Sequence, residues 1–174
     1  MLNVEEQKKF VNIMTNSLLF KGAMVVQLPM AGLSGMKIPV LNEEECHVTV
    51  PYKHLNKNPF GSTYWAVLGM AAEMASGALL VMFCRGIKPS VSTFVTGTNA
   101  KFIKQAKGVT TFICKDGLKI KAAVEGAQRD GIDIPQALDA VAKVEAFQEA
   151  MTEPAAEDDT DEPDDPTDLE PDNE

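Results

Sequence analysis

The chain is poor in residues that bind transition metals or form disulfides. It has only three cysteines, Cys46, Cys84 and Cys114, and two histidines, His47 and His54. Because the cysteines share no metal-type spacing and their number is odd, we expect free, reduced thiols in a cytoplasmic protein that has no metal site and no cofactor. The two histidines are expected to be ordinary strand and loop residues without a catalytic role.

Basic residues are absent from the C-terminal end. Residues 153–174 contain 12 acidic residues, four prolines, one large apolar residue and no lysine or arginine. A segment of this composition cannot bury enough apolar surface to fold. We therefore expect one folded domain at residues 1–152 and a disordered acidic tail at residues 153–174, for which solubility or charge shielding is a better role than a specific partner site.

Signals for nucleic-acid binding and for membrane insertion are also lacking. Residues 1–152 carry a net charge of only +3, which does not indicate a nucleic-acid partner. Near the N-terminus, Glu5, Glu6, Lys8 and Lys9 interrupt the apolar residues, so this segment resembles neither a signal peptide nor a membrane span. We expect neither nucleic acid nor a membrane as a partner.

The chain does have a long apolar segment, residues 61–83, that contains a single carboxylate, Glu73. The segment predicts a long central helix, which the Gly86-Ile-Lys-Pro89 sequence ends. Because burial of an unpaired carboxylate is costly, we expect Glu73 to be buried with compensation, paired, or used in chemistry. A purely structural glutamate, held by backbone groups or by a partner subunit, fits the sequence equally well.

Hydrophobic periodicity and turn residues predict further elements around this helix. The predicted elements are an amphipathic helix from Val4 that ends near Lys21-Gly22, strands at 23–28 and 46–52 with a loop between them, strands at 92–104 and 109–114 with a turn at Lys107-Gly108, a helix at 118–127, and a helix at 132–151 that begins near Pro135. The expected layout is α+β, with a mostly antiparallel sheet wrapped around the long helix.

The residues just before the long helix are a second candidate for ligand binding or catalysis. Asn58-Pro-Phe-Gly-Ser-Thr63 offers capping side chains and a glycine where backbone N–H groups lack partners. Such an end attracts developing negative charge. Gly69 and Gly77 lie four residues to either side of Glu73, so they flank the carboxylate on one helix face. They leave space for a ligand or simply let strands pack closely.

The sequence Asn58-Pro-Phe-Gly61-Ser62, followed by Glu73 fifteen positions after Asn58 and then by Ser76-Gly77, resembles the central-helix signature of hotdog-fold thioesterases. The resemblance covers residues 40–112 and is closest to a poorly characterised thioesterase-like branch. Residues 99–108 resemble a later strand of that branch. It implies a curved antiparallel sheet around a long central helix. It also implies a homodimer or higher homo-oligomer with active sites between subunits, and an acyl thioester of coenzyme A as substrate.

The resemblance also implies roles for individual residues. Glu73 corresponds to the general base that activates water, or to the nucleophile, and Asn58 to the residue that orients the water or the thioester. The backbone N–H of Trp65 corresponds to the donor that binds the thioester oxygen. Further substrate contacts are expected at Gly61, Ser62, Ala66 and Gly69, at Thr96 or Thr98 on a later strand, and, for the phosphates of coenzyme A, at Lys101 and Lys104.

Three features depart from the pattern of that family. Pro59 stands where active relatives have histidine, Trp65 and Ala66 stand where they have glycine, and a helical pattern at 132–151 replaces the last strand of the sheet. Trp65 either blocks the approach of a thioester, stacks on an acyl chain, or packs in a dimer interface. The alternative function is therefore a non-catalytic hotdog protein that binds acyl groups or acts as a dimeric scaffold. A hydratase or dehydratase would need a histidine closer to the helix start than His54.

Overall fold

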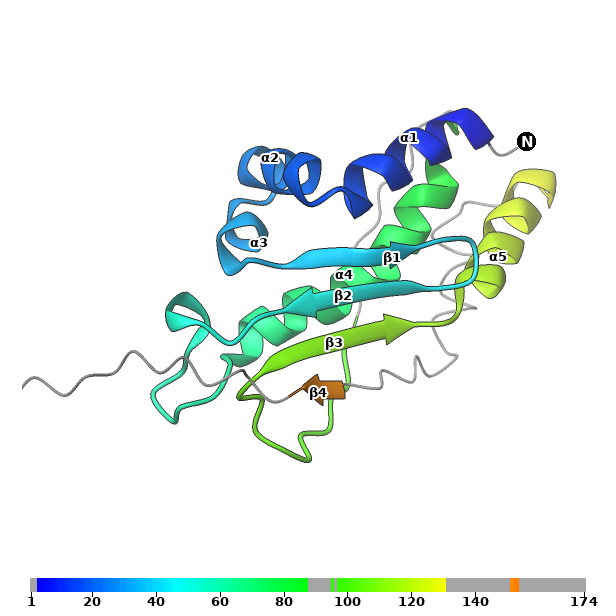
Figure 1. Cartoon of the computed structure of the whole chain (residues 1–174). Coiled ribbons are helices and arrows are strands. Elements are labelled where there is room, and N and C mark those ends of the chain that lie inside the picture. Colours follow the sequence, from blue (N-terminus) through cyan, green and yellow to red (C-terminus); the bar gives the residue numbers. More distant parts are fainter. Residues whose placement is uncertain (1–2, 88–94, 96, 131–150, 154–174) are drawn as a thin grey trace, which may run out of the picture.

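The computed structural model describes residues 3–87, 95, 97–130 and 151–153. Its elements form an α+β arrangement in which one long helix, α4, packs against an antiparallel sheet (Figure 1). In chain order they are α1 (Val4–Thr15), α2 (Ser17–Gln27), α3 (Pro29–Ser34), β1 (Lys37–Leu41), β2 (Cys46–Val50), the 3-10 helix η1 (His54–Asn56), α4 (Trp65–Cys84), β3 (Val109–Cys114), α5 (Gly117–Asp130) and β4 (Met151–Glu153).

The sheet has the strand order β1-β2-β3-β4, and every neighbouring pair is antiparallel. β1 and β2 form a hairpin whose turn is held by the Asn42 side chain, which accepts hydrogen bonds from the backbone N–H groups of Glu44 and Glu45 at 2.8 and 2.9 Å. β2 alternates buried and half-buried residues, as a strand with one face on the core does. The predicted strand at 46–52 and the predicted strand at 109–114 are therefore confirmed.

The core lies between the sheet and α4. One face of α4 is buried through small and medium apolar residues, and Leu79 and Phe83 are among the largest fully buried side chains. These residues pack against β2 and β3, with Val48 and Val50 on the facing strand. Three of the seven buried residues of α4 are alanines, which have high helix propensity. The predicted central helix is confirmed, and so is the helix at 118–127, which corresponds to α5.

The first third of the chain differs from the prediction. The single N-terminal helix is two helices, because Asn16 adopts an extended backbone that ends α1 and its side chain caps α2 through the N–H groups of Leu18 and Leu19. The predicted strand at 23–28 is wrong, since this segment is the second half of α2. The loop expected before residue 46 instead contains α3, which starts with Pro29 and ends at Gly35 in a left-handed conformation, and the strand β1.

The region after α4 also differs from the prediction. The described part of the predicted strand at 92–104, namely Val95 and residues 97–104, contains no strand, and the remaining positions lie outside the described residues. All of the predicted helix at 132–151 except Met151 lies outside them as well. Met151 begins β4, a short strand that pairs with β3, so the sheet extends beyond β3 and β4 reaches into the segment that was expected to be tail.

α4 is long and apolar enough to cross a membrane by length and composition alone. Here it contacts β2, β3, α1 and α5. A helix buried in the core of a globular domain has the same composition, and the packing of α4 accounts for the apolar residues on its inner face.

Candidate active-site face on the central helix

The start of α4 is fixed by hydrogen bonds to two other segments. The N–H of Tyr64 donates to the carbonyl of Asn56 at 2.7 Å. The N–H and the hydroxyl of Thr63 both donate to the carbonyl of Ala106, at 2.8 and 3.1 Å, which ties the segment before β3 to the helix start. The position of the first turn of α4 is therefore set by η1 and by the approach to β3.

Asn56 is a positioning residue that the sequence analysis missed. Its side chain is only 1% exposed, and its amide nitrogen donates to the carbonyls of Ser34 at 2.9 Å and Pro51 at 2.7 Å. It therefore joins the end of α3, the end of β2 and the start of α4. An asparagine in a polar stretch resembles a loop residue in the sequence, and no local pattern distinguishes a buried one.

Asn58 organises the loop in front of α4. Its side-chain oxygen accepts hydrogen bonds from the N–H groups of Phe60 and Ser62, at 2.9 and 3.1 Å, and its amide nitrogen donates to the Ser62 hydroxyl at 2.8 Å. Gly61, at φ 70°, supplies the left-handed conformation that this tight turn needs. The predicted residues Asn58, Gly61 and Ser62 thus lie together. Since Asn58 uses both its oxygen lone pairs within the loop, its second amide hydrogen is the group left for a ligand.

The first two backbone N–H groups of α4 are available. Tyr64 provides no side-chain cap, and the N–H groups of Trp65 and Ala66 have no acceptor in the part of the chain that the structure describes. The first N–H groups of a helix need an external partner and lie at the positive end of the helix dipole. Ala66 is exposed, so a ligand oxygen has access to this end.

Glu73 lies two turns further along the outward face of α4. It is exposed, and its carboxylate makes no hydrogen bond or ion pair with the described residues. Of the alternatives expected for Glu73, neither burial nor pairing is seen among the described residues, so a role in chemistry or a contact with a partner subunit stays a prediction. The residues around it on this face are small or apolar, because Gly69 precedes it by one turn and Gly77 follows it by one turn. The outward face of α4 is an apolar surface that carries one carboxylate.

Trp65 lies beside this carboxylate-bearing face. It is 43% exposed, and its indole lies over Gly69, where a Cβ would stand at an ordinary contact distance of 3.7 Å from the ring. Phe102 meets the indole edge to face, with ring centroids 4.9 Å apart. The two aromatic rings form an apolar surface next to the helix start.

The helix start and Glu73 are too far apart to act on one bond within one chain. Trp65 and Glu73 are eight positions apart, which is about 12 Å along the helix axis. Side chains on a helix lean toward its N-terminus, and this shortens the gap without closing it. A thioester carbonyl that accepts the N–H of Trp65 therefore cannot also receive a water held by Glu73 of the same chain.

The remaining predicted site residues are less well placed. Thr98 is exposed and lies outside any strand, as do Lys101 and Lys104, while Thr96 lies outside the described residues. Cys46 and Cys114 face each other across β2 and β3 as free thiols. Burial raises the pKa of Cys46 to about 12, so this thiol is not a nucleophile near neutral pH. Within the described ranges, no cluster of three or more potential metal ligands occurs.

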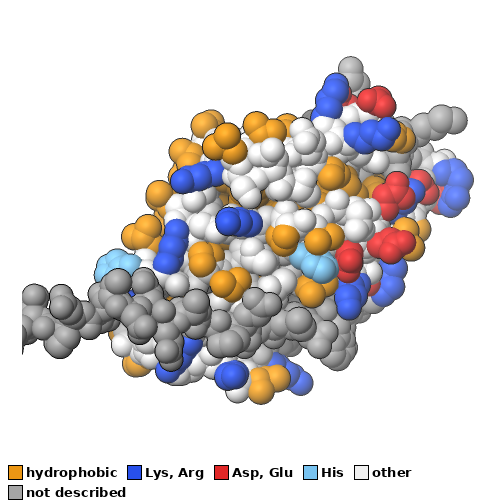
Figure 2. Space-filling model, in the orientation of Figure 1, with side chains coloured by type: hydrophobic (Ala, Val, Ile, Leu, Met, Phe, Trp, Pro, Cys, Tyr) orange, Lys and Arg blue, Asp and Glu red, His pale blue; other side chains and the backbone are white. Residues whose placement is uncertain are grey.

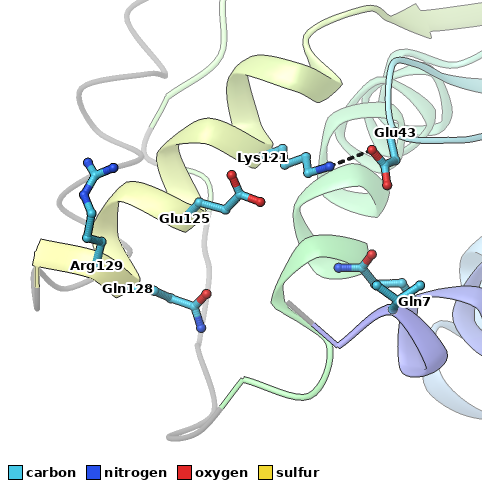
Figure 3. A pocket seen from close by; sticks show the side chains of 7 residues that line it. Gln7, Glu43, Lys121, Glu125, Gln128 and Arg129 are labelled. Carbon is cyan, nitrogen blue, oxygen red and sulfur yellow. Dashed lines mark hydrogen bonds and ion pairs between the residues drawn. The ribbon is translucent and has the colours of Figure 1, made fainter. Parts of the chain in front are cut away.

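Two hollows lie on the surface of the described structure. The larger, of about 480 Å³, lies between α1, α5 and the β1–β2 turn, where Lys121 and Glu43 form an ion pair at 2.7 Å (Figure 3). Its polar lining suits no acyl chain. The smaller, of about 90 Å³, lies beside the first two turns of α4. Its lining is mainly apolar and consists of Met30, Leu33, Ser34, Leu55, Asn56, Val67 and Met70.

The fold and the α4 face together define an α+β protein with an antiparallel sheet, a long core helix and an exposed carboxylate on that helix. A family model described as Domain of unknown function (DUF4442) matches residues 16–131, so the chain belongs to this family. No curated protein gave a significant match.

Two solved structures share the fold. One is the protein OLEI01261 of unknown function from Chlorobaculum tepidum TLS, with a TM-score of 0.55 and 22% identity over 69% of this chain and 76% of that chain. The other is the protein of unknown function PA5026 from Pseudomonas aeruginosa, described as a probable thioesterase, with a TM-score of 0.51 and 22% identity over 66% of this chain and 76% of that chain. At this identity the likeness establishes the fold alone.

Proposed function

We propose that this protein is a hotdog-fold hydrolase that cleaves an acyl thioester of coenzyme A or a related carrier. The observation that carries the proposal is the outward face of α4, where an unpaired carboxylate, Glu73, stands on an apolar surface beyond a helix start with two free N–H groups. The resemblance at Asn58, Gly61 and Glu73 supports the same reaction. The description of the Pseudomonas aeruginosa protein as a probable thioesterase agrees with it.

The proposed reaction needs a base and an oxyanion donor. Glu73 accepts a proton from water as the water oxygen bonds to the thioester carbon, and the carbonyl electrons move onto the oxygen. The N–H of Trp65, with Ala66 beside it, donates to this oxyanion. When the carbonyl re-forms, the carbon–sulfur bond breaks and the leaving thiolate takes the proton from Glu73. The products are a carboxylic acid and a thiol.

The distance along α4 supports a dimeric enzyme. Because about 12 Å separates Trp65 from Glu73 along one helix, the proposed site combines the helix start of one chain with Glu73 of the partner subunit. The apolar outward face of α4, which this chain leaves uncovered, then becomes part of the interface.

A second candidate is a non-catalytic protein that binds acyl groups or serves as a dimeric scaffold. The packing of Trp65 against Gly69 and Phe102 favours it, because the rings fill space beside the helix start that a thioester would otherwise approach. The apolar hollow at Val67 and Met70 fits acyl binding in either case.

Hydrolysis of a panel of acyl-CoA thioesters by the wild type, Glu73→Gln and Glu125→Gln tests the proposal. Glu125 is a matched exposed glutamate on α5. We expect turnover by the wild type and by Glu125→Gln, and a loss of about 10²-fold or more in Glu73→Gln, since it cannot accept a proton. Circular dichroism checks that all three are folded. Acyl-CoA binding without turnover would favour the non-catalytic candidate, and equal turnover by wild type and Glu73→Gln would refute the role of Glu73.

A further inference from the structure

The helix α2 is apolar on both of its faces. Phe20 and Met24 point into the core, as one face of a packed helix should. The opposite face is also apolar, with Leu18 80% exposed and Val26 82% exposed. A helix on the surface of a globular protein normally carries polar residues on its outer face. Both faces of α2 therefore need an explanation, and the core explains only one.

The apolar outer surface continues from α2 onto α3. Gly32 lies so close to α2 that a Cβ there would stand 3.0 Å from the backbone nitrogen of Val25, which shows how tightly the two helices pack. We call their common exposed surface the α2–α3 patch. Its apolar residues are Leu18, Leu19, Val25, Val26, Leu28, Met30 and Leu33, all of them exposed.

The charges around the α2–α3 patch have one sign. Lys21 lies on α2, and the ammonium group of Lys53 donates to the Leu33 carbonyl on α3 at 2.7 Å. No aspartate or glutamate occurs between Glu6 and Glu43. Figure 2 shows hydrophobic side chains over α2 and α3, with lysines among them and acidic side chains confined to the other end of this face.

The charge and the apolar character of the patch argue against a second copy of this chain and against the acidic segment 153–174 as the molecule that covers it. In a symmetric contact between two copies the patch faces itself, so Lys21 and Lys53 would approach lysines with no carboxylate to pair them. The acidic segment 153–174 complements the lysines, but Leu169 is its only large apolar residue, so it cannot cover the exposed leucines and valines. A partner must offer both negative charge and an apolar interior.

We propose that the α2–α3 patch docks this protein on an anionic lipid bilayer. Helices with an exposed apolar face can lie in the plane of the membrane interface, with that face in the region between headgroups and acyl chains, and the outer face of α2 can do so while its inner face stays in the core. Lysines beside such a helix are attracted to the anionic headgroups. The docking surface is separate from Glu73 and does not depend on hydrolysis. It replaces the expectation, drawn from the lack of a signal peptide or span, that a membrane is no partner.

Co-sedimentation with vesicles of stated composition tests the docking. The full chain is mixed with equimolar phosphatidylcholine and phosphatidylglycerol vesicles, or with phosphatidylcholine vesicles alone. We expect binding to the anionic vesicles that weakens with added salt, and much weaker binding to neutral ones. The double variant Leu18→Asp/Val26→Asp should lose binding. Lys21→Glu should lower the affinity for anionic vesicles about fivefold.

The controls distinguish binding through the α2–α3 patch from nonspecific binding to vesicles. Leu118→Asp places the same charge at an exposed leucine on α5 and should bind like the wild type. If the double aspartate variant does not fold by circular dichroism, Val26→Ser replaces it and should bind more weakly than wild type. Failure of the wild type to bind anionic vesicles overturns the proposal. So does a fall in mass by light scattering for the patch variant, because this would identify the patch as a contact between copies.

Discussion

A single buried amide, that of Asn56, determines where the candidate site begins. The side-chain nitrogen of Asn56 donates to the carbonyls of Ser34 and Pro51, while the backbone carbonyl of Asn56 accepts the N–H of Tyr64. Without the side-chain amide, the buried Ser34 carbonyl and the half-buried Pro51 carbonyl would lose this donor, which costs more than the hydrogen bond itself contributes. Asn56 therefore fixes the position of the helix start that carries the free N–H groups of Trp65 and Ala66.

Replacement of Asn56 should destabilise the fold strongly. Asn56→Ala leaves two carbonyls without donors and a small cavity, so we expect the free energy of unfolding to fall by about 2–4 kcal/mol. Urea denaturation followed by circular dichroism measures this change. Asn12→Ala, an exposed asparagine on α1, is the matched control and should change stability by less than about 0.5 kcal/mol. Equal effects at the two positions would contradict the role of Asn56.

At the residue scale, the sequence indicated the candidate catalytic residue, but it did not indicate the residue that positions the start of α4. A carboxylate alone in an apolar helix stands out in any window, and Glu73 was singled out on that basis. Asn56 was not, because its importance comes from carbonyls at Ser34 and Pro51, and nothing local shows which backbone groups will meet a side chain after folding. Whether Glu73 is buried, paired or used in chemistry stayed open in the sequence for the same reason, since burial depends on what covers the helix.

At the scale of elements, Asn16 separates two helices with different surroundings. Its extended backbone ends α1 while its side chain caps α2 at 3.0 and 3.1 Å. The hydrophobic pattern runs on through this point, so the sequence predicted one helix. A single residue that prefers caps to helix interiors thus sets the direction of α2 and the orientation of the α2–α3 patch.

Loss of this cap should weaken the fold by a modest amount. We expect Asn16→Ala to lower the free energy of unfolding by about 1 kcal/mol, because two N–H groups of α2 lose their acceptor. Asn16→Ser keeps a capping oxygen and should stay within a few tenths of a kcal/mol of the wild type. Thermal and urea unfolding of the three proteins give the comparison. Matching losses in both variants would mean that the cap contributes nothing.

Predictions of elements succeeded where one pattern had a single interpretation. The segments that became β2, β3 and α5 combine periodicity with flanking turn residues, and α4 is a long apolar run that turn residues end. The segment 23–28 is apolar on every side, and such a run fits a strand and a helix equally. β1 was missed because it contains Pro39, which a strand accepts at an edge, and because its register with β2 shifts between Lys37 and Val40.

At the scale of the whole molecule, the chain leaves the outward face of α4 open. This face joins the free N–H of Trp65 at one end to Glu73 two turns later, so a site that needs both must come from two copies. In the proposed dimer each site needs the backbone N–H of Trp65 from one chain and the Glu73 carboxylate from the other, and each requirement can be tested separately. Trp65→Pro removes the N–H at a helix position that accepts proline, and Tyr64 before it already has an extended backbone. Trp65→Ala removes the indole but keeps the N–H.

The two inactive chains should restore activity when they are paired. Trp65→Pro and Glu73→Gln are co-expressed with different tags, and the mixed dimer is isolated through both. One of its two sites then holds an intact N–H from one chain and an intact carboxylate from the other, so we expect about half of the wild-type thioesterase activity. Trp65→Ala should retain more activity than Trp65→Pro if the N–H is what binds the oxyanion. A mixed dimer no more active than its parents would mean that each site is built within one chain, against the distance along α4.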